Sequence, residues 1–197
     1  LGYGAYEKIK NSFLNKIIRF ETLLTATQYF SWAKIGNPYM GVGRNLAYKK
    51  EEFFNVRGFM DHMKIRSGDD DLFINQAATN KNTEILFTPE SFTLSEPKTT
   101  FKSWFYQKRR HATTAKHYKG FDKFQLGLFF FSQFWFFITA IVLLAFQFQW
   151  MIVLGILLFR YLFTWISLGY AAAKLKEKDV MYWYPIIELI LIFTQLN

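Results

Sequence analysis

A long stretch without any charged residue is the feature that most constrains this chain. It runs from Phe124 to Phe159, between Lys123 and Arg160. Crossing about 30 Å of hydrocarbon takes about 20 helical residues, so the stretch is too long for one membrane span. Two glutamines and Trp150 lie at residues 147–150, and such residues are favoured at membrane interfaces. We therefore predict membrane helices at about residues 126–146 and 150–172.

A further apolar run begins near Val180, with the aromatic group Tyr182–Tyr184 close to its start. Aromatic residues anchor helices at membrane interfaces, so a third span is expected over residues 180–197. Arg160 and Glu188 lie inside the predicted spans, where a charge is costly in lipid. Each is expected to face other helices, a cavity or the lipid headgroups.

The remaining charge is divided unevenly along the chain. Of the 24 lysines and arginines, all but Arg160, Lys174, Lys176 and Lys178 precede residue 125. The basic segments on either side of the first two spans fall on one side of the membrane, and basic loops stay in the cytoplasm. The pattern predicts a multi-pass cell-membrane protein with a cytoplasmic domain over 1–122 and membrane helices over 123–197. A helical hairpin buried in a large soluble core is the alternative.

The soluble half predicts short helices alternating with strands, an α/β layer that is incomplete in this chain. A helix is expected over residues 11–33, ended by the breaker sequence Gly36-Asn37-Pro38. The other expected elements are a strand-like stretch over 39–48, helices over 51–56, 72–79 and 99–111, and strands over 84–87 and 91–94.

Three adjacent aspartates, Asp69, Asp70 and Asp71, form the most suggestive polar group. One interpretation is structural, because acidic residues in a first helical turn are stabilised by the helix dipole. The other is a general base or metal ligand, since crowded like charges raise at least one carboxyl pKa toward neutrality. A calcium loop is excluded because Phe73 occupies the next ligand position.

A second polar group is Gln107, Arg110 and His111, spaced to share one face of a helix. Such side chains could hold a diphosphate or an acceptor sugar; a basic helix lying on anionic lipid headgroups is the alternative. Gly43 and Asn45 belong to a glycine-containing stretch that lacks the spacing of a nucleotide fingerprint. The net charge of +9 is explained by membrane orientation, so no nucleic-acid partner is expected.

Several enzyme classes are excluded by what the sequence lacks. There is no cysteine, so disulfides and thiolate-bound zinc are absent. The three histidines form no HExxH arrangement, and no nucleophile elbow is present.

Taken in order, these pieces resemble the membrane-bound family-2 glycosyltransferases, the group that includes cellulose- and hyaluronan-synthase-like enzymes. The resemblance covers roughly residues 1–175 and ends in membrane helices, as in that family. His111 stands where the family has tryptophan, which removes an expected aromatic platform for the acceptor sugar. The matching segments are Gly43-Arg44-Asn45 leading to Lys49-Lys50, Ser67-Gly68-Asp69-Asp70-Asp71-Leu72, Ser95-Glu96-Pro97 and Gln107-Lys108-Arg109-Arg110-His111.

The resemblance implies a partial GT-A-type, Rossmann-like domain that transfers a sugar from a nucleotide-sugar donor with inversion. Asp69, favoured by gap-free alignment, or Asp70 would be the general base, and Gln107, Arg110, His111, Gly43 and Asn45 would contact the substrates. An Asp-x-Asp motif expected upstream of residue 1 would hold Mg²⁺ or Mn²⁺, so the chain alone is expected to be inactive. The acceptor would be a lipid-linked group or a polysaccharide. The alternative is a non-catalytic membrane protein whose basic helix binds membrane lipids.

Overall fold

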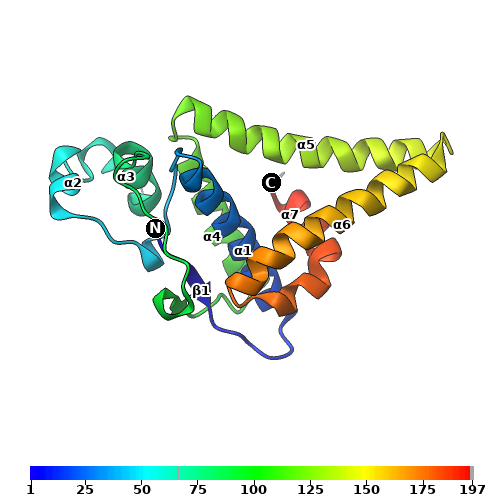
Figure 1. Ribbon diagram of the computed structural model, residues 1–197, viewed down its shortest axis with the longest axis horizontal. Helices are drawn as coiled ribbons and strands as arrows, with labels where there is room; N and C mark the ends of the chain where they lie inside the picture. The colour runs from blue at the N-terminus through cyan, green and yellow to red at the C-terminus, as the bar shows by residue number, and fades with distance from the viewer. Residues whose placement is uncertain (66, 196–197) are drawn as a thin grey trace.

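The computed structural model describes residues 1–65 and 67–195, and they are mostly helical (Figure 1). A small parallel sheet and seven α-helices are joined by short 3-10 turns. In chain order the elements are β1 (Gly4–Tyr6), α1 (Phe13–Lys34), η1 (Gly43–Asn45), α2 (Lys50–Asn55), η2 (Met60–His62), α3 (Asp69–Ala77), η3 (Pro89–Ser91), β2 (Thr93–Ser95), α4 (Phe101–Ala115), α5 (Gly120–Ala145), α6 (Trp150–Lys174), η4 (Lys178–Trp183) and α7 (Tyr184–Gln195).

The sheet is smaller than an α/β layer requires. It has two parallel strands, with Gly4 opposite Thr93 and Tyr6 opposite Ser95. The strand expected over 84–87 supplies only an isolated bridge from Leu86 to Gly2, and β1 itself was not predicted. The GT-A-type α/β fold is therefore only weakly represented among the described residues.

The strand predicted over residues 39–48 is wrong. The segment instead makes the 3-10 turn η1, because its polar groups bond to the start of the chain. The Asn45 carbonyl accepts a hydrogen bond from the Gly2 amide (2.9 Å). The Asn45 side chain donates to the carbonyls of Tyr3 (3.0 Å) and Ser91 (2.7 Å), so it joins η1 to the residue before β1 and to the end of η3.

Helix α1 is the centre of the core. Ser12 caps it by accepting a hydrogen bond from the Asn15 amide (3.2 Å). Its apolar side chains are buried against β1, α6, η4 and α7. The predicted helix over 11–33 is confirmed, and α2, α3 and α4 confirm the other three predicted helices to within three to four residues at their ends.

Helices α5 and α6 form a long hairpin that extends away from the other elements (Figure 1). They have 26 and 25 residues, or roughly 38 Å at 1.5 Å per residue. Both are long and apolar enough to cross a membrane. In the most apolar 18-residue stretch of α5 and of α6, only 6% and 11% is buried. This exposure argues against a hairpin buried in a soluble core.

The third predicted span, over 180–197, is not one continuous membrane helix in the described part of the chain. It begins with the 3-10 turn η4 and continues as the 12-residue helix α7, which covers roughly 18 Å. Residues 196–197 lie outside the described residues. Helix α7 packs against α1 and α5, so one side of it is covered by protein.

Arg160 of α6 and Glu188 of α7 form an ion pair between helices. The guanidinium donates to both carboxylate oxygens, at 3.0 and 2.5 Å. Its charge also lies over the rings of Phe136 and Phe137, 5.0 and 4.7 Å from their centroids. Both residues thus face other helices, as the sequence predicts.

A second ion-pair network joins α1 to the loop that follows α6. Arg19 is 2% exposed and pairs with the buried Glu177 and with Asp179, whose Oδ2 accepts from the guanidinium at 2.8 Å. Lys8 adds a bond to Asp179 (2.9 Å), and the Tyr3 hydroxyl donates to Glu177 (3.4 Å). The network fixes the end of the apolar hairpin to the core.

Candidate active site

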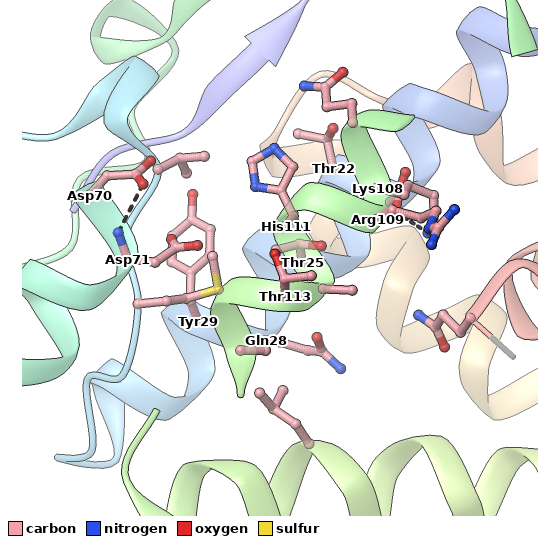
Figure 2. A pocket seen from close by; sticks show the side chains of 18 of the residues that line it. Thr22, Thr25, Gln28, Tyr29, Asp70, Asp71, Lys108, Arg109, His111 and Thr113 are labelled. Atoms are coloured by element: carbon pink, nitrogen blue, oxygen red, sulfur yellow. Dashed lines mark hydrogen bonds and ion pairs between the residues drawn. The ribbon is translucent and has the colours of Figure 1, made fainter. Parts of the chain in front are cut away.

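A cavity of about 570 Å³ lies between α1, α3 and α4 (Figure 2). Polar side chains from all three helices and aromatic side chains from β1 and α1 form its walls. Among the residues that line it are Tyr6, Glu21, Thr22, Thr25, Gln28, Tyr29, Arg44, Asp70, Asp71, Trp104, Gln107, Lys108, Arg109, His111, Thr113, Lys116, Tyr118, Leu126, Thr194 and Gln195.

The three aspartates occupy the first turn of α3 but differ in environment. Asp69 is exposed and lies outside the cavity lining, whereas Asp70 and Asp71 line it. The Asp70 carboxylate accepts hydrogen bonds from the amides of Gly43 (2.5 Å) and Asp71 (2.9 Å). These bonds orient Asp70 in the cavity wall.

Gly43 and Asn45, which the sequence predicts to contact the substrates, lie outside the cavity lining. A Cβ at Gly43 would lie 2.9 Å from the Asp70 carboxylate, so glycine allows this close approach. Neither residue lines the cavity; Gly43 positions Asp70, and Asn45 joins η1 to the segments just before β1 and β2. The side chain between them, Arg44, does line the cavity and lies over the Tyr6 ring, 4.0 Å from its centroid.

Helix α4 brings two of its three predicted residues to the cavity. Gln107 and His111 line it, and the Gln107 amide donates to the Tyr6 hydroxyl (3.3 Å). Arg110 is exposed and outside the lining. Its neighbour Arg109 lines the cavity instead. In the view of Figure 2, His111 lies between the aspartates and the Lys108–Arg109 end.

A match to a protein family covers the three helices between which the cavity lies. Residues 4–174, from β1 to the end of α6, match the family described as glycosyl transferase family group 2. The chain belongs to this family. No curated protein and no solved structure shows significant similarity to the chain. Membership implies a glycosyltransferase, with a nucleotide-sugar donor and a glycan acceptor in general.

The metal that the resemblance implies does not fit the residues at hand. Among the described residues, no group of three His, Asp or Glu side chains could hold an ion. One Asp70 oxygen accepts from Gly43 and the other from Asp71. The Mg²⁺ or Mn²⁺ of the glycosyltransferase stays a prediction, and no step described below depends on it.

Asp71 is the buried acid of the site. It is 5% exposed and hydrogen-bonded to Tyr118. Burial, followed by the charge of Asp70, raises the pKa of Asp71 to about 7. The sequence predicts such a raised pKa within the aspartate cluster, although it does not show that Asp71 is the residue affected.

This raised pKa predicts a stability that depends on pH. Because folded Asp71 holds its proton above the ordinary 3.8, folding takes up a proton in this range, so the free energy of unfolding falls as pH rises toward 7. The Asp71→Asn variant, which has no proton to lose, is expected to show a flatter profile. Thermal unfolding at about pH 5 and about pH 8 measures the difference; parallel profiles for variant and wild type would contradict it.

A buried polar network fixes α3 to the start of α5. The Asn75 amide donates to Asp122 (2.7 Å) and to the Tyr39 carbonyl (2.9 Å), and its oxygen accepts from the Lys119 amide (2.9 Å). Asn37 donates to the other Asp122 oxygen (3.1 Å). The cavity wall formed by α3 is thereby attached to the first apolar helix.

Gly68, directly before α3, sets the distance between α3 and α4. Its φ is +88°, and an added Cβ would lie 2.0 Å from the Thr114 methyl carbon. Gly68→Ala is expected to cost about 1–2 kcal/mol for left-handed backbone, plus about 1–3 kcal/mol for the overlap. Adding Thr114→Ser, which removes the methyl group, should recover the second part only. Thermal unfolding measures both, and no recovery would contradict the contact.

Proposed function

We propose that the protein is a membrane-bound inverting glycosyltransferase acting at the cytoplasmic membrane face. It moves a sugar from a nucleotide-sugar donor to a lipid-linked or polysaccharide acceptor. Family membership supports the transfer of sugar in general. The observation that carries the proposal is the Asp70 carboxylate, held by backbone amides in the wall of a cavity that also has basic residues.

Asp70 is the proposed general base. It accepts the proton of the acceptor hydroxyl as that oxygen bonds to the anomeric carbon and the bond from that carbon to the diphosphate oxygen breaks. Attack opposite the leaving group inverts the anomeric centre. Asp69, which gap-free alignment favours, is exposed outside the cavity, so the geometry supports Asp70.

The leaving nucleoside diphosphate carries negative charge that the cavity can balance. Arg44, Arg109 and Lys116 line it together with His111, and guanidinium groups suit phosphate oxygens. Lys108 is already paired with Glu21. Gln107 hydrogen-bonds Tyr6 and is placed to contact the substrate. Arg110, outside the lining, has no proposed contact.

The proposed membrane position follows from α5 and α6. Both are candidate spans by length and composition, and Leu126 of α5 lines the cavity. The site would then lie at the bilayer surface, where a lipid-linked acceptor is accessible. Orientation with α4 in the cytoplasm follows from the basic segments on either side of the hairpin.

The test is release of nucleoside diphosphate by the gene's full-length product in its membranes, with Mg²⁺ or Mn²⁺ and a panel of nucleotide-sugar donors. Turnover that requires both donor and acceptor supports the transferase. The rival is a lipid-binding protein, favoured by the exposed cations of α4 such as Lys102, Arg109 and Arg110. Binding to anionic vesicles that is lost with these cations, without turnover of any donor, would replace the proposal.

A further inference from the structure

One wall of the cavity is polar but carries little free charge. Thr22, Thr25 and Gln28 lie three residues apart on α1 and all line the cavity, since this spacing keeps side chains on one helical face. Thr113 of α4 lies beside this group in the view of Figure 2. We call Thr22, Thr25 and Gln28 the α1 wall.

The α1 wall keeps hydrogen-bonding capacity for a ligand. The Thr22 hydroxyl donates to the Ile18 carbonyl (2.8 Å), and its oxygen lone pairs remain able to accept. The side chains of Thr25 and Gln28 have no hydrogen-bond partner among the described residues, although both residues are only partly exposed. Half-buried hydroxyl and amide groups that face a cavity are satisfied by water or by a ligand.

Charge near the α1 wall is already paired. Glu21, on the same helix, forms an ion pair with Lys108 and accepts from the Trp104 indole (2.9 Å). The other cations of the lining, Arg44, Arg109 and Lys116, come from η1, from α4 and from the residue that follows α4. Because Glu21 is paired, a charged group against the α1 wall would lose hydration without gaining a free counter-charge from α1 itself.

We propose that the α1 wall binds an uncharged, hydroxylated ring: the sugar residue of the acceptor that receives the transferred group. Amide and hydroxyl groups donate and accept at once, which matches sugar hydroxyls. Recognition then depends on hydrogen bonds from Thr25 and Gln28, with His111 standing where the family's aromatic platform is expected. This inference rests on the proposed function and adds the face that selects the acceptor.

The test uses the intact protein in nanodiscs and measures saturation transfer from protein to added sugars by NMR. The probes are the methyl glycosides of glucose, galactose, mannose and N-acetylglucosamine, with methyl glucuronide as a charged counterpart. At least one neutral glycoside is expected to receive saturation. Thr25→Val and Gln28→Leu should each reduce the signal about fivefold, the effect of a lost hydrogen bond worth about 1 kcal/mol.

Thr27→Val is the matched control. Thr27 lies on the same helix, donates to the Leu23 carbonyl (2.8 Å) and does not line the cavity, so its signal should equal that of wild type. The proposal would be overturned if no neutral glycoside received saturation, or if methyl glucuronide gave the stronger signal. It would also be overturned if neither cavity variant reduced the signal, or if Thr27→Val reduced it as much as Thr25→Val.

Nucleoside diphosphate release in the same samples separates the two proposals. If nucleoside diphosphate is still released but glycoside binding does not depend on Thr25 and Gln28, the α1-wall proposal is contradicted and the transferase proposal stands. If glycoside binding depends on both residues but no donor releases its diphosphate, the α1 wall is supported as a sugar site and the transferase proposal is contradicted.

Discussion

Replacing Asp70 with asparagine is expected to lower the rate of sugar transfer about 10²–10⁴-fold, the usual contribution of a general base. The amide has nearly the shape of the carboxylate, and its oxygen can still accept the 2.5 Å hydrogen bond from Gly43, while the bond from the Asp71 amide (2.9 Å) is lost. The local fold is therefore kept while the proton acceptor is lost. Initial rates of nucleoside diphosphate release at saturating donor and acceptor measure the effect.

Asp69→Asn is the control for this prediction. Asp69 shares the first turn of α3 but is exposed outside the cavity, so its variant is expected to keep nearly the wild-type rate. If Asp69→Asn lost activity while Asp70→Asn stayed active, Asp69, the residue that sequence alignment favours, would be the general base. Unchanged unfolding temperatures would show that the Asp70→Asn loss is chemical.

The second large effect is expected on stability, from Arg19→Leu. Arg19 and Glu177 are 2% exposed, and removing one partner leaves the other charge buried without compensation. Breaking a buried pair in this way costs about 3–5 kcal/mol. Thermal unfolding of the protein in detergent, followed by circular dichroism, should show a much lower midpoint and less folded material.

Lys8→Ala provides the contrast. Lys8 bonds to the same Asp179, but its side chain is 53% exposed, and exposed pairs contribute about 0–1 kcal/mol. Arg19→Leu combined with Glu177→Leu should regain part of the lost stability, because no uncompensated charge then remains. Similar small losses for Arg19→Leu and Lys8→Ala would show that the buried network is not a main support of the fold.

The sequence predicts the helices better than the contacts between them. Local patterns place α1, α5 and α6 because apolar spacing and breakers act over a few residues. The strand predicted over 39–48 fails because Asn45 bonds to Tyr3 and Ser91, 42 and 46 residues away in the chain. Local propensity contains no information about such partners.

The same distinction holds for the site. The aspartate cluster and the Gln107–His111 face are visible as short motifs, but the exposure that separates Asp70 from Asp69 depends on how α3 meets η1. Arg44 and Arg109 lie within motifs of the family resemblance, but no local pattern marks them as cavity residues. The threonines of α1 gave no signal, because a threonine on a helix is ordinary until a cavity is seen beside it.

If α5 and α6 span the bilayer as proposed, the Arg160–Glu188 pair has a consequence for how the chain enters it. The two residues are 28 positions apart, and translation adds about 5–20 residues per second. Arg160 would therefore wait roughly 1–6 s for its partner, and an unpaired arginine at the centre of a span costs about 2.5–3.5 kcal/mol. During that interval α6 would be retained beside the insertion machinery, until α7 emerges and both leave for the lipid as one unit.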